Sequence, residues 1–347
     1  MKNIYKKISI MMLLIATTFL LAACGNGENG TNTTETVKEK DLVFRLGYPA
    51  TSSDVVQGLP GIAIEQKYFE EEFDKIGVKF EAIPFVKAGP AINAAIASGE
   101  IEGALRMGDV PSIVAKASGA ETTLVDIQPF DYDTHLVVRK DLKLDSVADL
   151  KGKTIAVQTS SFMQRILYQI LDANGLSPDD VELVNMSETD AATSIAAGTI
   201  DATPVTELKA AKLVLNGSVY TLFETSKNPE MAGMLATIIN TSFAKEHPEV
   251  IEAYFKALLK AQDYAVEHPE DLRELCVESG IEEAVVDWAY PSVEDFGHTT
   301  GTLDETYEYF KKVINFLVDN KIASSKVDLD EWFDDSYYKK ALEEYNK

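Results

Sequence analysis

The chain has 347 residues, of which 46% are hydrophobic and 25% charged, so it has the composition of a soluble globular protein and the length for two domains. Its 56 acidic residues outnumber the 32 basic ones and give a formal net charge of −24, which argues against nucleic-acid binding because that function needs a basic surface. The same excess means that an anionic ligand must be held by local hydrogen-bond donors against the field of the whole protein.

The first 23 residues have the order of a signal peptide. Three lysines precede an uncharged apolar run, Ile8–Leu21, and Leu-Ala-Ala then leads into Cys24. This order resembles the lipobox of bacterial lipoproteins, which implies cleavage before Cys24 and a diacylglycerol on its thiol. The alternatives are an ordinary signal peptide or a transmembrane anchor, but the run is shorter than the roughly 20 apolar residues that span a bilayer. We therefore expect lipid anchoring on the extracytoplasmic face of the cell membrane.

The next segment, residues 24–41, is polar and is expected to be a flexible tether between the lipid and the folded part. Removal of residues 1–23 takes away three lysines and lowers the formal net charge from −24 to −27. The chain has only two cysteines, so a disulfide framework is excluded, and Cys276 is expected to be a small buried side chain in a helix. The four histidines are scattered without metal-ligand spacing, so we expect neither a metal nor a cofactor.

The folded part begins with an alternation of apolar runs and amphipathic segments that is typical of parallel βαβ units. The expected strands and helices of this first half are strand 42–48, helix 60–73, strand 78–83, helix 90–98 and strand 101–107. The same order then returns in the second half as strand 154–157, a helix from Phe162 that stops at Gly175, strand 181–186, helix 190–197 and strand 200–205. The chain is helix-rich after Pro248, and these late helices are expected to cover the first half.

Two short stretches repeat between the halves. Ile96–Gly103 mirrors Ile195–Ala202 residue by residue, and each first strand leads to a Thr-Ser-Ser, at 51–53 and at 159–161. The alternative is coincidence among common junctions of helix and strand. Taken with the repeated order of elements, the pattern predicts two lobes of the same topology that face each other.

These motifs resemble the solute-binding lipoproteins of ABC importers for nitrate, taurine and aliphatic sulfonates, the NitT/TauT-like family. The residues that carry the resemblance are 98–102, 108–111, 149–157 and 197–202, with a weaker match at 246–249. The resemblance implies an α/β fold of the periplasmic-binding-protein type II class, with a two-segment hinge. Lobe 1 would comprise residues 42–132 and 243–347, and lobe 2 residues 134–242. It also implies a monomer that performs no reaction and delivers its solute to a permease with an ATPase.

The resemblance also implies a ligand site in lobe 2 at Thr159, Ser160 and Ser161, where the family has Gly-Ser-Ser at a helix N-terminus. Free N–H groups and the positive end of a helix bind anions, and hydroxyls add donors. The alternative is that Ser160 or Ser161 only caps its helix. By the internal symmetry, Thr51, Ser52 and Ser53 are expected to touch the same ligand from lobe 1.

Four further residues of lobe 1 are candidates for ligand contact. Gly108 and Asp109 lie between a strand and a helix, where α/β sheets bind ligands, although Asp109 is also a plausible N-cap. Arg106 ends an apolar strand and can bind an anion with its forked guanidinium, or else form an ion pair with Asp109 or Glu102. Phe85 either walls the pocket or packs in the core. By contrast, Arg165 is expected on the surface of its helix.

Two departures from the family concern the floor of the expected pocket. Thr206 and Glu207 stand where sulfonate-binding relatives often have a segment ending in Trp-Asp-Pro, and Met163 replaces a histidine. These changes leave open a receptor for a neutral heterocycle, such as a thiamine-precursor pyrimidine. A biosynthetic enzyme on the same fold is a further alternative, which the lipobox and the lack of an acid-base or metal cluster in the sequence disfavour.

Overall fold

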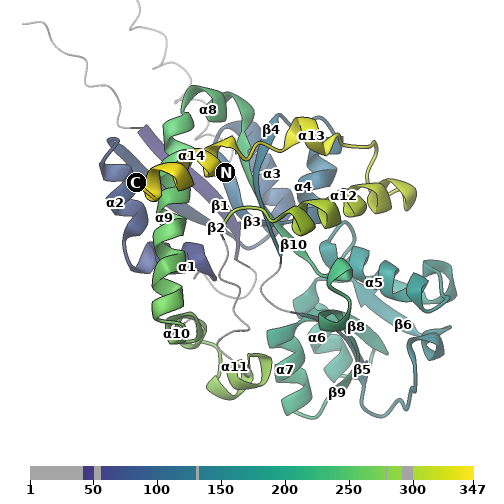
Figure 1. The fold of residues 1–347 in the computed structure, drawn as a ribbon. Coiled ribbons are helices and arrows are strands. Elements are labelled where there is room, and N and C mark those ends of the chain that lie inside the picture. The colour runs from purple at the N-terminus through teal and green to yellow at the C-terminus, as the bar shows by residue number, and fades with distance from the viewer. Residues whose placement is uncertain (1–41, 51–55, 130–132, 279, 291–299) are drawn as a thin grey trace, which may run out of the picture. The chain divides into compact units, whose positions relative to one another are not determined.

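The structure is a computed structural model that describes residues 42–50, 56–129, 133–278, 280–290 and 300–347. The predictions for the signal peptide, for Cys24 and the tether, and for Thr51, Ser52 and Ser53 lie outside the described residues. Two five-stranded sheets, each covered by helices, make up the described part, and both belong to the unit that spans residues 41–347 (Figure 1).

The two sheets have corresponding strand orders. The first is β2-β1-β3-β10-β4, formed by β1 (Leu42–Pro49), β2 (Val78–Phe85), β3 (Gly103–Gly108), β4 (Thr122–Pro129) and β10 (Met234–Asn240). The second is β7-β6-β8-β5-β9, formed by β5 (Thr134–Arg139), β6 (Thr154–Val157), β7 (Glu182–Asn185), β8 (Ala202–Thr206) and β9 (Val219–Glu224). In each sheet the fourth strand runs antiparallel to both of its neighbours. The predicted α/β class and the repeated topology are confirmed.

One strand lies on the other side of an expected boundary. β10 pairs with β3 and β4 of the first sheet, whereas the expected lobe 2 extended to residue 242. The chain therefore returns to the first sheet before Met234.

Helices of the first half of the chain and of its C-terminal part pack together on the first sheet. They are α1 (Leu59–Glu65), α2 (Tyr68–Asp74), α3 (Ala88–Ser98), α4 (Asp109–Ala117), α8 (Thr241–Glu246), α9 (Pro248–Glu267), α10 (Glu270–Glu278), α12 (Asp304–Asp319), α13 (Leu329–Trp332) and α14 (Ser336–Tyr345). The expected helix 60–73 is two helices, because Lys67 adopts a left-handed conformation with a φ of 60°. Cys276 is buried in α10, as predicted.

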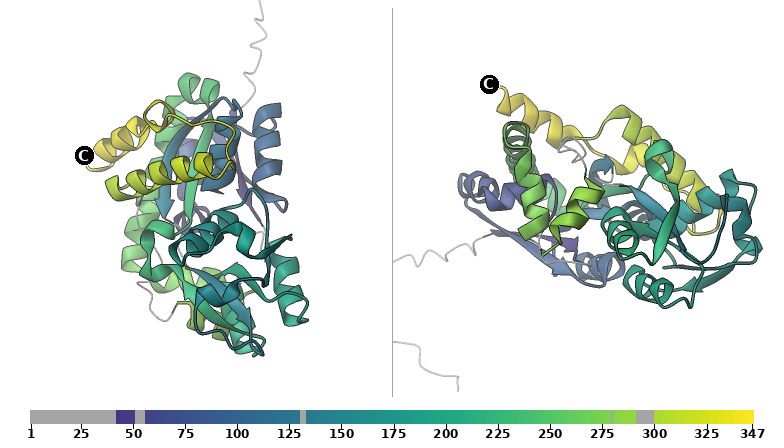
Figure 2. Two further views of the ribbon diagram at one scale, coloured as in Figure 1. Left: turned by 90° about the vertical axis from the view of Figure 1, so that its right-hand side faces the viewer. Right: turned by 90° about the horizontal axis from the view of Figure 1, so that it is seen from below.

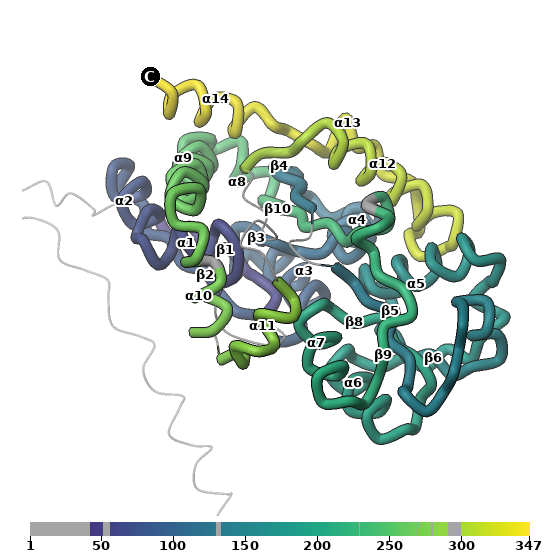
Figure 3. Tube along the Cα trace, turned by 60° about the horizontal axis from the view of Figure 1, so that its bottom comes forward, coloured from purple at the N-terminus to yellow at the C-terminus, as the bar shows by residue number. Residues whose placement is uncertain are grey.

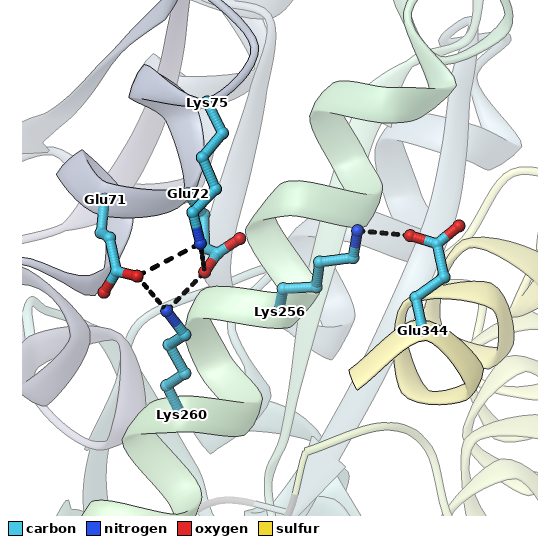
Figure 4. A network of polar contacts seen from close by, with 6 residues as sticks. All are labelled: Glu71, Glu72, Lys75, Lys256, Lys260 and Glu344. Carbon is cyan, nitrogen blue, oxygen red and sulfur yellow. Dashed lines mark hydrogen bonds and ion pairs between the residues drawn. The ribbon is translucent and has the colours of Figure 1, made fainter. Parts of the chain in front are cut away.

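The longest of these helices, α9, is the centre of the first core and lies between α2 and α14 (Figures 1 and 4). Its Tyr254 stacks on Phe69 of α2 with ring centroids 5.5 Å apart. Its Lys260 bridges Glu71 and Glu72 at 2.6 and 2.5 Å, and its Lys256 binds a glutamate of α14. Helices α9 and α14 thus pack with the helices of the first sheet, where the C-terminal helices were expected.

The second sheet is covered mainly by its own helices. These are α5 (Phe162–Ala173), α6 (Glu188–Ala196) and α7 (Glu207–Leu215). One helix of the C-terminal part, α11 (Glu283–Ala289), also contacts α7 (Figure 3). Its Trp288 packs against the core beneath the second sheet. No helix of the described residues combines the length and the apolar character needed to cross a membrane.

The repeated junctions have the same hydrogen bonding in both lobes. Gly99 and Gly198 follow α3 and α6 with φ values of 73° and 75°, a conformation that favours glycine. The next amide then donates back to the carbonyl five residues earlier, from Glu100 to Ala95 at 2.9 Å and from Thr199 to Ser194 at 3.0 Å. The sequence similarity of residues 96–103 and 195–202 thus reflects the same type of turn between helix and strand in both lobes.

Candidate functional site

The strand order brings the expected site residues of the second sheet to one edge. β6 and β8 are parallel neighbours, so the segments that follow them, Thr159–Ser161 and Glu207, leave the same edge of the sheet. β5 runs antiparallel to β8 and begins at this edge, with Thr134 opposite Thr206 and His135 opposite Val205. In the first sheet, β3 ends at Gly108, directly before α4.

Ser161 is the N-cap of α5. Its hydroxyl accepts from Gln164 N at 3.2 Å and donates to Gln158 O at 2.6 Å. Ser160 is exposed and has a φ of 56°, which is unusual for a residue with a side chain. The N–H groups of Thr159 and Ser160 donate to the side-chain oxygens of Asn185 and Gln164, at 3.0 and 2.8 Å. The cap accounts for Ser161, and ligand contact by the three residues stays a prediction.

The first turn of α5 meets the start of α4 on the other sheet. Phe162 has a ring carbon 3.5 Å from where a Cβ of Gly108 would lie, and it packs against hydrophobic clusters of both sheets. Contacts between α4 and α5 therefore lie next to the expected site residues of both lobes. Figure 2 shows the two sheets and their helices from two further sides.

Arg165 is fully buried, and the expectation that it lies on the surface was wrong. Its Nη2 is 2.8 Å from the Asp109 carboxylate and 2.8 Å from Ala232 O, and its Nη1 reaches Gln169 at 2.7 Å. The first turn of α5 packs against α4, so the arginine points into protein rather than into water. The ion pair joins the two sheets and the segment that leads into β10.

Asp109 is also fully buried, and it does not cap α4 with its side chain. Its Oδ2 accepts from Arg165 and from Met234 N, and its Oδ1 accepts from Val110 N. Burial raises the pKa of Asp109, while the Arg165 guanidinium and the two amides act to lower it. The carboxylate is thus committed to protein partners, and a role of Asp109 toward a ligand stays a prediction.

Arg106 is half-buried and has a φ of 52° at an irregularity of the first sheet. The register between β3 and β10 shifts opposite Thr237. The two acidic partners that the sequence offered it are bound elsewhere, since Glu102 pairs with Arg45 at 3.1 Å and Asp109 with Arg165. Burial raises the pKa of the nearby Tyr254, and the charge of Arg106 acts to lower it. Anion binding by Arg106 stays a prediction.

The neighbourhood of this irregularity is polar and buried. Asp126 of β4 is opposite Thr237 of β10, and burial raises the pKa of its carboxyl to about 6 even though Gln128 and Thr302 donate hydrogen bonds to it.

Phe85 is half-buried, and its ring packs beside Gly47 of β1. Packing therefore accounts for Phe85 without a ligand, and its role in a pocket stays a prediction.

Thr206 and Glu207 lie at the start of α7 and have different partners. The N–H and the hydroxyl of Thr206 both donate to Glu188 Oε1, at 2.7 and 2.8 Å, and Lys209 reaches the other oxygen of Glu188 at 3.3 Å. Glu207 Oε2 accepts from Asp133 N at 3.0 Å, and its Oε1 lies 3.7 Å from His135 Nε2. Ligand contact by Thr206 and Glu207 stays a prediction.

Asp133, His135 and Glu207 form a group that sequence reasoning missed. One ligand atom from each residue lies within 4.8 Å of the others. Asp133 and His135 are two positions apart at the start of an apolar strand, and residues with this spacing face the same side of a sheet. That spacing was a usable signal, but the contact with Glu207 depends on the pairing of β5 with β8, which the sequence pattern does not specify.

Comparison with known proteins shows which binding proteins this sequence resembles. The sequence is 26% identical over 97% of its length to a Bacillus subtilis (strain 168) protein, also covered to 97%, that is provisionally named an aliphatic sulfonates-binding protein. It is 26% identical to the formylaminopyrimidine-binding protein of Halalkalibacterium halodurans, with 77% of each chain covered. Residues 112–272 match the family described as NMT1/THI5 like. Over these residues the chain is similar to the NMT1/THI5-like family. The family resemblance predicted from the motifs is confirmed.

Solved structures confirm the fold. The periplasmic sulfonate-binding protein SsuA from Methylobacillus flagellatus KT superposes with a TM-score of 0.73 at 24% identity, covering 89% of this chain and 96% of that one. The desulfurization enzyme DSZB has the same fold, with a TM-score of 0.67 at 17% identity and coverage of 87% and 99%. The predicted periplasmic-binding-protein type II fold is therefore correct, and this fold occurs both in binding proteins and in an enzyme.

Proposed function

We propose that the protein is the solute-binding component of an ABC importer. It captures a small anion of the sulfonate, taurine or nitrate type in a cleft between its two lobes, performs no reaction, and delivers the solute to a permease. The observation that carries this proposal is the pairing of two sheets of corresponding order whose strand ends meet at the starts of α4 and α5. The relative that matches along 97% of both chains is named for aliphatic sulfonates, and it supplies the ligand class.

The start of α5 supplies the donors for an anion. The N–H groups of Thr159 and Ser160 now donate to neutral amide oxygens of Asn185 and Gln164. A charged sulfonate oxygen forms a hydrogen bond about twice as strong as a neutral one, so it competes well for these donors. The positive end of the α5 dipole and the Ser161 hydroxyl act in the same direction, which offsets the net charge of −24.

The ligand class is tested first by mass spectrometry of the small molecules released from freshly purified protein, and then by calorimetric titration with taurine, ethanesulfonate and nitrate. Ser161→Ala is expected to weaken binding of the best of these about fivefold, the effect of one hydrogen bond of about 1 kcal/mol. Ser187→Ala is the matched control, because Ser187 caps α6 as Ser161 caps α5. Equal affinities of the two variants, or release of an uncharged compound, would contradict an anion site at α5.

Glu207 and Asp133 favour a second candidate, a receptor for a neutral heterocycle. Their carboxylates lie together beside His135, and the centroid of the Trp288 ring is 5.5 Å from that of the His135 ring. Carboxylates accept hydrogen bonds from ring N–H or amino groups, and an aromatic ring stacks on a heterocycle. The relative named for formylaminopyrimidine supports this candidate. Release of a heterocycle in the mass spectrometric experiment would replace the anion proposal by this one.

We also propose that the protein is anchored to the outer face of the cell membrane by a diacylglycerol on Cys24, as the lipobox pattern indicates. Cells that express the protein are expected to incorporate a clickable fatty acid into it, and Cys24→Ala is expected to abolish this labelling and to release the protein from membranes. Cys276→Ala is the control, since Cys276 is buried in α10 and should not affect labelling. A wild-type protein without label would contradict the anchor.

A further inference from the structure

The group of Asp133, His135 and Glu207 has donor atoms from three segments at one point. Asp133 directly precedes β5, His135 lies in β5, and Glu207 is the first residue of α7. Their nearest ligand atoms lie within 4.8 Å of one another, and His135 Nε2 is 3.7 Å from Glu207 Oε1. The group therefore offers one imidazole nitrogen and two carboxylates to a common centre.

The imidazole of His135 is almost completely buried, and its Nε2 has no hydrogen-bond partner among the residues that the structure describes. The side chain is 5% exposed. A buried polar atom of this kind is costly unless something binds it. The distance of 3.7 Å from Nε2 to Glu207 Oε1 is too long for a hydrogen bond, and the spacing of the ligand atoms of all three residues suits an ion between them.

Neighbouring side chains hold each of the three donors in place, as the outer partners of metal ligands do. The other ring nitrogen, His135 Nδ1, is 3.3 Å from Thr221 Oγ1. When Nδ1 donates to this oxygen, Nε2 keeps the lone pair that a metal needs. Glu207 Oε2 accepts from Asp133 N at 3.0 Å, and Asp133 Oδ1 accepts from Thr225 Oγ1 at 3.1 Å.

We propose that Asp133, His135 and Glu207 bind a divalent transition-metal ion of the zinc class. One imidazole and two carboxylates form a donor set that suits zinc better than calcium or magnesium, which take oxygen ligands alone. Two carboxylates this close repel each other, and a dication removes that repulsion while it satisfies Nε2. Three protein ligands leave a fourth position to water or to a solute. The proposal does not rest on the anion proposed above, because the donors at α5 are not part of this group, whereas the heterocycle candidate uses the same two carboxylates and competes with it.

The test is titration of chelator-treated full-length protein with Co²⁺, followed by visible absorption, and with Zn²⁺, followed by calorimetry. We expect one equivalent of each metal to bind and Co²⁺ to give the absorption of a coordinated ion. His135→Gln and Glu207→Gln are expected to weaken binding at least tenfold, and Thr221→Val, which alters only the support of the imidazole, by about 10- to 100-fold. Circular dichroism of each variant checks that it is folded.

His247→Gln is the matched control. His247 also lies beside a carboxylate, with Nδ1 3.5 Å from Glu249, but its side chain is one-third exposed and lies outside the group. This variant is expected to bind Co²⁺ and Zn²⁺ as the wild type does. Absence of stoichiometric binding by the wild type, binding that survives Glu207→Gln and Thr221→Val, or binding that is lost in His247→Gln would each overturn the proposal. Glu207→Gln and Thr221→Val decide the question even if His135→Gln does not fold.

Discussion

Arg165 and Asp109 form a fully buried ion pair between α5 and α4, which belong to different sheets. Removing both charges from water costs free energy. The pair is stable nevertheless, because almost every polar atom around it has a hydrogen-bond partner. Met234 N and Val110 N donate to the carboxylate, while Ala232 O and Gln169 accept from the guanidinium. Within the described residues, Arg165 Nε is the exception without a hydrogen bond. Loss of one partner leaves the other as an uncompensated buried charge.

Arg165→Gln is therefore expected to lower the free energy of unfolding by about 3–5 kcal/mol, because it leaves the Asp109 carboxylate buried without its cation. Urea unfolding followed by circular dichroism measures the change. Arg273→Gln is the control, since Arg273 also binds two carboxylates but is 30% exposed, and it is expected to cost at most about 1 kcal/mol. If both variants lost the same free energy of unfolding, burial would not determine the strength of the Asp109–Arg165 pair.

At the scale of single residues, local patterns predicted the site better than distant contacts did. Ser161 stands directly before an amphipathic helix, so its alternative role as an N-cap was predictable and is confirmed. Arg165 and Asp109 are 56 positions apart, and only the packing of α5 on α4 turns the arginine inward. His135 was set aside because its chain neighbours contain no metal-ligand spacing, and its partner Glu207 comes from another strand end.

At the scale of elements, the pattern of apolar residues located all six predicted strands to within two residues, because strand alternation and turn residues are local, while β4, β5, β9 and β10 were not predicted. The repeated stretches Ile96–Gly103 and Ile195–Ala202 also form equivalent hydrogen bonds in the two sheets. Glu102 accepts from Arg45 N in β1 at 2.6 Å, and Asp201 accepts from Thr154 N in β6 at 3.0 Å, so the two carboxylates perform the same task.

Two features of the elements could not be predicted from such patterns. The break between α1 and α2 occurs at Lys67, a residue type that gives no turn signal, and it is the packing against α9 that places each short helix separately. The assignment of β10 to the first sheet depends on its pairing with β3 and β4. An apolar strand between two lobes fits either sheet by composition, so only its tertiary pairing decides.

At the scale of the whole molecule, the net charge of −24 sets how a solute approaches. At low salt the Debye length is about 30 Å, so an anion is repelled by the whole surface before it meets the donors at α5. At about 0.2 M salt the repulsion is confined to less than 10 Å, while hydrogen bonds inside the site are hardly screened. The rate of association of an anion should therefore rise with salt.

For ethanesulfonate we expect the association rate constant to increase at least about twofold between 10 and 200 mM sodium chloride, with a smaller change in the dissociation rate. Stopped-flow fluorescence measures both rates, because Trp288 lies beside the edge of the second sheet where the expected site residues gather. A neutral heterocycle feels no net field and serves as the control, with an association rate that does not depend on salt. A rate for ethanesulfonate that falls with salt would show that local positive groups, rather than the acidic surface, govern the approach. The same measurements also separate the two candidate ligand classes. If the solute that binds tightly is an anion, its association rate constant rises with salt, and if it is a neutral heterocycle, the rate constant does not change.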